Sequence, residues 1–76
     1  MNLRFFHFFE YALYQFWDDI DEINSFLDMI SQLTGKEFKA KYGYGSSLKF
    51  KTKTHSYTID FTLTGDLVDF KNISRK

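Results

Sequence analysis

The side chains able to carry acid–base or nucleophilic chemistry are few and lie far apart in the sequence. A catalytic triad would have to combine Ser46 or Ser47 with His55 and Asp60. No Gly-x-Ser-x-Gly turn, which presents a nucleophilic serine at a sharp bend, accompanies these residues. His7 and His55 have no neighbours at metal-ligand spacing, and "YGYGS" lacks the spacing of a phosphate-binding loop. We therefore expect no enzyme activity, no metal site and no cofactor.

Carboxylates crowd the stretch "WDDIDEI", where four acids fall close together: Asp18, Asp19, Asp21 and Glu22. Their spacing does not match a calcium-binding loop, which needs a glycine and a later glutamate. One interpretation is a solvated helix start, because acids are stabilised near the positive end of a helix. The other is a partner-binding site, in which the carboxylates imitate nucleic-acid phosphates and enter a basic pocket on another protein.

Lysines alternate with apolar residues in two later segments: Lys39, Lys41, Lys49, Lys51 and Lys53. If the segments are neighbouring strands, all five ammonium groups share one polar face. Such a face binds phosphates with a salt-sensitive affinity. The alternative is a solvated face whose lysines block edge-to-edge aggregation. Tyr44, in the glycine-containing turn, is a ring that would reach a bound base.

Charge is divided unevenly along the chain, although the formal net charge is zero. Between Phe5 and Gly35 there is no lysine or arginine, and the six acids are Glu10, Asp18, Asp19, Asp21, Glu22 and Asp28. From Lys36 onward, nine basic residues outnumber four acids. The chain therefore joins an acidic half to a basic half.

Apolar residues in the first half repeat at alternating steps of three and four, which is typical of a helix. The stripe consists of Phe6, Phe9, Leu13, Phe16, Ile20, Ile23, Leu27 and Ile30. We favour one continuous helix over residues 3–33, because a turn would usually reset the phase. The alternative is a break near Asp18–Asp19, with Asp19 as N-cap and Glu22 at the capping-box position.

After Gly35 the apolar period changes to two, which is typical of half-buried strands. Four segments alternate in this way: "EFKAKYGY", "LKFKTK", "YTIDFTLT" and "LVDFK". Short links, among them Gly65-Asp66, favour an antiparallel meander. We predict an α+β fold, in which a long N-terminal amphipathic helix, whole or broken, packs on a four-stranded antiparallel β-meander. Residues 1–76 form a single domain, helical and acidic in 1–35 and a basic meander in 36–73.

The length of the predicted helix bears on the oligomeric state. A continuous helix over residues 3–33 would span about 46 Å, whereas the predicted strands span only about 23 Å. The helix would overhang the sheet, and its aromatic half would need a second copy of the chain or a target protein. This arrangement predicts a homodimer through the N-terminal helix.

The sequence favours a location away from membranes. No run of about 18 apolar residues is present to span a bilayer. His7 and Glu10 interrupt the N-terminal apolar run, so it does not match a secretory signal. Anionic lipid would repel the acidic helix, and the absence of cysteine fits a reducing compartment. We expect a cytoplasmic protein.

Eight of the thirteen residues in "FFHFFEYALYQFW" are aromatic. Phe5 widens the apolar stripe on one side, and four other rings lie off it. The four are Phe8, Tyr11, Tyr14 and Trp17. Rings outside the core seam of a helix are candidates for contact with a partner. Together with Asp18, Asp19, Asp21 and Glu22, they form the predicted partner-binding set.

In its short length, its Lys/Phe-rich composition and its motif-free α+β organisation, the chain resembles small phage and mobile-element proteins that inhibit host enzymes or defence complexes, anti-CRISPR proteins among them. This resemblance implies a non-enzymatic inhibitor that occludes a host protein or ribonucleoprotein complex in the host cytoplasm. It carries over no site residues. Two alternatives stay open: a small nucleic-acid-binding module that uses the lysine face, and a self-assembling structural module.

Overall fold

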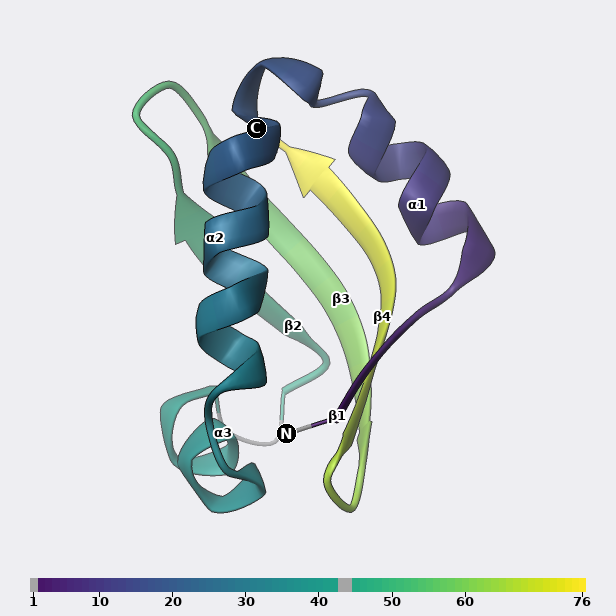
Figure 1. The fold of residues 1–76 in the computed structure, drawn as a ribbon, viewed down its shortest axis with the longest axis vertical. Helices are drawn as coiled ribbons and strands as arrows, with labels where there is room; N and C mark the ends of the chain where they lie inside the picture. The colour runs from purple at the N-terminus through teal and green to yellow at the C-terminus, as the bar shows by residue number, and fades with distance from the viewer. Residues whose placement is uncertain (1, 43–44) are drawn as a thin grey trace.

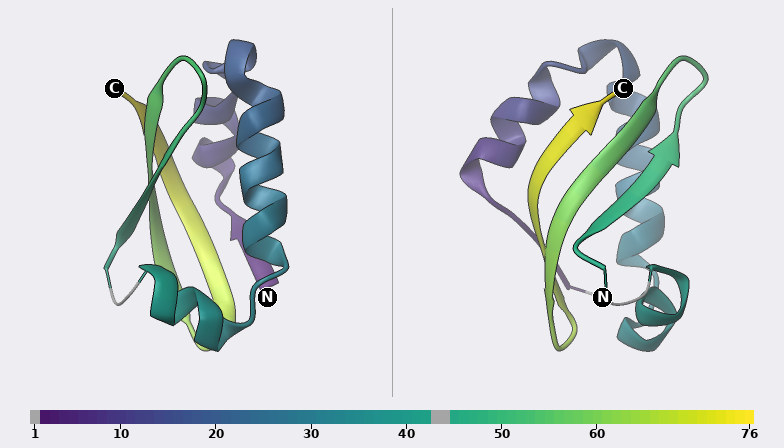
Figure 2. Two further views of the ribbon diagram at one scale, coloured as in Figure 1. Left: turned by 90° about the vertical axis from the view of Figure 1, so that its left-hand side faces the viewer. Right: turned by 180° about the vertical axis from the view of Figure 1, so that it is seen from behind.

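The computed structural model describes residues 2–42 and 45–76, without the side chain of Phe8. In chain order the elements are β1 (Asn2–Phe5), α1 (His7–Tyr14), the 3-10 turn η1 (Trp17–Asp19), α2 (Ile20–Ser31), α3 (Gly35–Tyr42), β2 (Ser47–Lys51), β3 (Ser56–Thr64) and β4 (Leu67–Arg75). The strands form one sheet, and the helices lie on one face of it (Figures 1 and 2). The predicted α+β class is confirmed.

The sheet is mixed, so the prediction of a purely antiparallel meander is wrong. Its strand order is β1-β4-β3-β2. The strands β2, β3 and β4 are joined by antiparallel pairing as predicted. However, β1 pairs in parallel with β4, with Asn2 opposite Leu67 and Phe5 opposite Phe70. A parallel neighbour requires a long crossover connection, and the segment from α1 through β3 provides it.

The N-terminal half is not one helix over residues 3–33. Residues 2–5 are extended, and Phe16 leaves the helical region with φ −111° and ψ 39°. The chain then turns through η1 and re-enters a helix at Ile20, with Asp19 at the N-cap position. The alternative break near Asp18–Asp19 is therefore confirmed, but the capping box predicted with it does not form, because Asp19 makes no side-chain cap hydrogen bond and Glu22 accepts from the Lys53 N–H. Since α1 and α2 are short, separate helices, the continuous helix that would have overhung the sheet does not form, and the argument for a dimer from an overhang falls away.

The segment predicted as the first strand is helix α3. Its start is fixed by a reciprocal pair of hydrogen bonds in which the Glu37 N–H donates to Thr34 Oγ1 at 3.1 Å and the Thr34 N–H donates to Glu37 Oε1 at 3.0 Å. This capping box satisfies two donors that a helix start leaves unpaired. One turn apart, Phe38 and Tyr42 bring their ring centroids to 5.0 Å. Phe38 is buried, and Tyr42 packs against the core.

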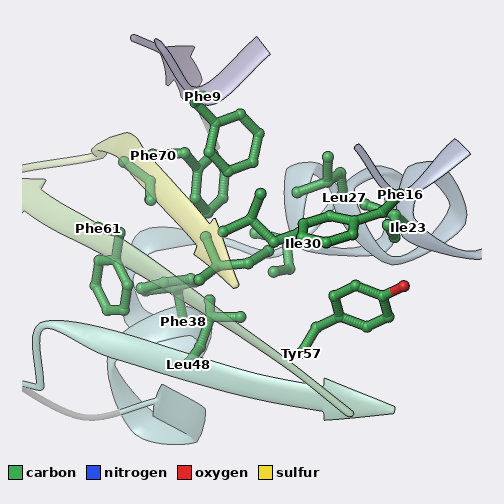
Figure 3. Packing of buried hydrophobic residues seen from close by; sticks show 13 residues of the cluster. Phe9, Phe16, Ile23, Leu27, Ile30, Phe38, Leu48, Tyr57, Phe61 and Phe70 are labelled. Atoms are coloured by element: carbon green, nitrogen blue, oxygen red, sulfur yellow. The ribbon is translucent and has the colours of Figure 1, made fainter. Parts of the chain in front are cut away.

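The core lies between the helices and the sheet and is dominated by rings (Figure 3). Phe9 of α1 stacks on Phe70 of β4 with centroids 5.8 Å apart, and Phe38 meets Phe61 edge-on at 5.2 Å. The remaining buried apolar residues are Phe16, Ile23, Leu27, Ile30, Leu48, Tyr57, Ile59, Val68 and Ile73. Large rings supply much of the buried apolar area that a chain this small needs.

Candidate functional site

Three large rings stand in solvent on α1 and at the start of η1. Tyr11, Tyr14 and Trp17 are 62%, 66% and 67% exposed. Tyr11 and Tyr14 lie one turn apart on α1, and Trp17 follows after Phe16 has left the helical region. His7, one turn earlier, meets the Tyr11 ring edge-on with centroids 4.7 Å apart. We refer to Tyr11, Tyr14 and Trp17 as the aromatic ridge.

The ridge is exposed because the opposite side of α1 packs on the sheet. Phe9 is fully buried against β4, and Phe16 covers Tyr57 with ring centroids 5.3 Å apart. The prediction that Tyr11, Tyr14 and Trp17 lie off the buried stripe is confirmed. Phe8, the fourth ring of that prediction, belongs to α1, and its side chain lies outside the described part of the chain.

Exposed acids precede and follow the residues of the aromatic ridge in the sequence. Glu10 is exposed between the ridge and the start of α1, and Asp18 and Asp21 are exposed beyond Trp17. Asp18 accepts hydrogen bonds from Arg75 Nη1 at 3.1 and 3.2 Å. No lysine or arginine occurs in the sequence between Phe5 and Gly35. The segment that carries the ridge is therefore acidic, and Arg75, a cation in contact with it, is paired with Asp18.

Asp19 does not belong to this exposed surface, contrary to the sequence prediction. It is only 4% exposed, and its carboxylate accepts a short hydrogen bond from the Tyr57 hydroxyl. The hydroxyls of Thr52 and Thr54 donate to it at 3.2 and 2.9 Å, and His55 Nδ1 lies 3.0 Å from it. These contacts, that with Tyr57 foremost, lower its pKa from 3.8 to about 2. Asp19 thus fastens η1 to the β2–β3 connection and is not available to a partner.

Glu22 is also engaged within the fold. Its Oε2 accepts a hydrogen bond from the Lys53 N–H at 3.0 Å, which ties α2 to the same β2–β3 connection. Of the four clustered acids, Asp18 and Asp21 are therefore the two that remain exposed. The partners of Asp19 and Glu22 follow them by more than thirty residues, which is why local spacing did not reveal them.

Asp18, Asp19 and His55 bring possible metal-ligand atoms within 4.8 Å of one another. These side chains nevertheless serve to join η1 to the β2–β3 connection by hydrogen bonds. Asp19 already accepts from three hydroxyls, and Asp18 faces the Arg75 guanidinium. A cation entering here would have to displace these donors and would be repelled by Arg75.

The five predicted lysines do not share one face. Lys39 and Lys41 lie on α3, because that segment is a helix, whereas Lys49 and Lys51 lie on β2 and Lys53 in the connection after it. Tyr44 lies outside the described residues. The sequence reasoning also missed Lys76, which lies on the other side of Ser56 from Lys51. No local signal could have found it, because strand pairing brings these residues together.

The residues considered for a catalytic triad are separated. Ser47 opens β2 and lies opposite Asp60 on the face away from the helices. His55 belongs to the connection at the other end of β2, where its ring turns to Asp19 on the helix side. The topology therefore keeps the histidine away from the serine.

No protein-family model, no curated protein and no solved structure matches this chain. Within the described residues, no helix is long and apolar enough to cross a membrane.

Proposed function

We propose that this chain is a non-enzymatic protein-binding module that docks the aromatic ridge onto a basic surface of another protein. The observation that carries the proposal is the exposure of Tyr11, Tyr14 and Trp17, three large rings within seven residues of α1 and η1. Rings of this size are usually buried or held by a partner, and here they stand in solvent while thirteen other apolar side chains are buried.

The chemistry of the ridge suits protein recognition. Tyrosine and tryptophan offer a large contact area with little loss of side-chain entropy, and they dominate the hot spots of protein interfaces. Their faces attract arginine and lysine through the ring quadrupole. The exposed carboxylate of Asp21 follows Trp17 in the sequence, and that of Asp18 is shared with Arg75. A partner with an arginine-rich or lysine-rich surface is therefore the one we propose.

A binding module that catalyses no reaction can inhibit its target by covering the surface that the target needs. The resemblance to phage-encoded inhibitors of host defence supplies the candidate class of target, a host protein or ribonucleoprotein complex. Under this proposal the chain covers a basic functional surface of that target and prevents its use.

The test is affinity capture with three versions of the chain: the unaltered protein, Tyr14→Ala/Trp17→Ala and Lys39→Ala/Lys41→Ala. The ridge variant should lose the captured target, and the α3 variant, which changes two exposed side chains elsewhere, should retain it. Trp17 is the only tryptophan of the chain, so its emission should shift to shorter wavelength as the purified target buries the indole.

Capture of the same target by the ridge variant at undiminished yield would contradict the proposal. So would an unchanged Trp17 emission in the purified complex. If the captured species is the chain itself, light scattering on the unaltered protein and the ridge variant would instead identify a self-assembling module.

A further inference from the structure

The outer face of the sheet, opposite the helices, is uncovered (Figure 2, right). Side chains alternate across a strand, so Phe50 and Tyr57 point to the helices while Lys49, Lys51 and Thr58 point outward. On this face the described strands present lysines and hydroxyls around a shallow hollow of about 550 Å³.

Two rows of polar side chains cross the strands beside this hollow. In one row Lys49 lies opposite Thr58, which lies opposite Ser74. In the next row Lys51 lies opposite Ser56, whose carbonyl accepts the Lys76 N–H at 2.9 Å. Neighbouring strands are about 4.8 Å apart and rows on one face about 7 Å apart. Three ammonium groups and three hydroxyls thus share one small area, and no acid lines it.

The acids of the outer face lie beside this area. Asp69 is 8% exposed, and its Oδ1 is 2.7 Å from Arg4 Nε, so a local cation already compensates it. Asp60 lies in the next row, opposite Ser47 and Asn72, and is exposed. The lysine rows are therefore cationic, with one uncompensated carboxylate at their border.

The side chains in the two rows are of types that favour a phosphate-bearing ligand over a protein. Protein interfaces are depleted in lysine and enriched in aromatic residues, and these rows contain lysine, serine and threonine alone. Lysine, serine and threonine are the side chains that hold the phosphates of nucleic acids. A single strand would need rings to stack on. Phe6, beside β1, is half-buried, and the cations of Arg4 and Lys71 lie 5.5 and 5.9 Å from its ring centre. Its ring is therefore already in contact with two cations, which disfavours its use as a stacking surface for a base.

We infer that the lysine rows, Lys49–Thr58–Ser74 and Lys51–Ser56–Lys76, bind the phosphate backbone of a double-stranded nucleic acid without reading its sequence. The acidic helices on the other layer are repelled by the same polyanion, so the chain approaches sheet first. This site is separate from the aromatic ridge and does not depend on the function proposed for it.

Fluorescence anisotropy of a labelled DNA duplex of about 20 base pairs tests the inference. With three phosphates neutralised, affinity should fall roughly fortyfold between about 50 and 200 mM salt. Lys49→Glu/Lys51→Glu should weaken binding at least about tenfold. Lys39→Glu/Lys41→Glu makes the same charge change on α3, at the other end of the sheet, and should leave most of the affinity. Asp60→Asn should strengthen binding, because it removes the bordering carboxylate.

Any of three results would overturn the inference. The unaltered chain fails to bind the duplex at low salt, the two lysine variants lose equal amounts of affinity, or a single strand of the same length binds more tightly than the duplex. Binding of polyglutamate as tight as that of the duplex would instead identify an acidic protein as the ligand. Circular dichroism checks that each variant is folded. If the double glutamate variant is not, Lys49→Gln/Lys51→Gln takes its place, with a smaller expected loss.

Discussion

Asp19 is the residue whose role is most sharply defined by its surroundings. Its carboxylate accepts from Tyr57, Thr52 and Thr54, and His55 lies against it. Asp19 lies at the N-cap position of α2, yet its side chain accepts no hydrogen bond from the N–H groups of that helix. A helix start at Asp19 was the alternative to the continuous helix that we favoured, and the structure has this start. The sequence could not reveal the role of the side chain, because these donors come from the other half of the chain.

The depressed pKa of Asp19 makes a stability prediction with a definite sign. Because its pKa falls from 3.8 to about 2 on folding, the charged carboxylate stabilises the fold fully above about pH 4, and this contribution is lost as the pH falls through about 2. Asp19→Asn should therefore lower the urea midpoint at pH 7. The gap to the unaltered protein should narrow between about pH 4 and 2. A gap independent of pH would contradict this role.

At the scale of elements, the apolar stripe was predictable and its continuity was misleading. Phe9 of α1 and Ile23 of α2 are both buried in the core, as is Phe16 between the two helices. The three-and-four spacing of the apolar residues continues past the break, because both helices bury their apolar sides against the same sheet. Similarly, the spacing of Phe38 and Tyr42 fits both a strand and one turn of helix.

The capping box of α3 is the local signal that distinguishes a helix from a strand in this segment. Thr34→Ala removes the hydroxyl that accepts the Glu37 N–H. Such a loss costs about 0.5–2 kcal/mol of unfolding free energy, which urea unfolding would measure. Glu37→Gln keeps an acceptor for the Thr34 N–H and should cost less than Thr34→Ala. The reverse order would mean that the box does not stabilise the helix.

The β3–β4 hairpin was predictable at its turn, Gly65-Asp66. Gly65 has φ +59°, in the left-handed region that favours glycine. Gly65→Ala should lower the unfolding free energy by about 1–2 kcal/mol. Gly45 provides the matched control, because a Cβ there meets only ordinary contacts at 3.7 and 3.8 Å. Equal effects of the two substitutions on the thermal midpoint would show that the turn conformation is not the cause.

At the scale of the molecule, stability and the proposed binding reside in different rings. A domain of this size has roughly 4–11 kcal/mol of stability. Phe9 is fully buried, and Phe9→Ala should remove about 3–5 kcal/mol of it. Trp17→Ala, at an exposed ring, should change it by no more than about 0.5 kcal/mol. Thermal unfolding of both variants checks this, and a large loss at Trp17 would mean that the ridge belongs to the core.

The whole-molecule charge layout was visible in the sequence, but its meaning in space was not. The acidic half became one layer of helices, with β1 leaving it to join the sheet. The basic half was divided between α3 and the outer face of the sheet, because Lys39 and Lys41 are helical. Consequently the ridge and the lysine rows lie on different layers, and substitutions in one leave the other intact.

The position of β4 has a consequence for how the chain is made. The strand at the C-terminal end lies inside the sheet, between β1 and β3, and among the described strands β1 pairs with β4 alone. A ribosome releases β1 first and β4 last. The first strand must therefore wait, unpaired, until Leu67–Arg75 has left the ribosome, and Phe9 waits with it for Phe70. A nascent chain stalled before Leu67 thus lacks the strand on which both β1 and α1 pack, and its aromatic residues are open to chaperones and proteases.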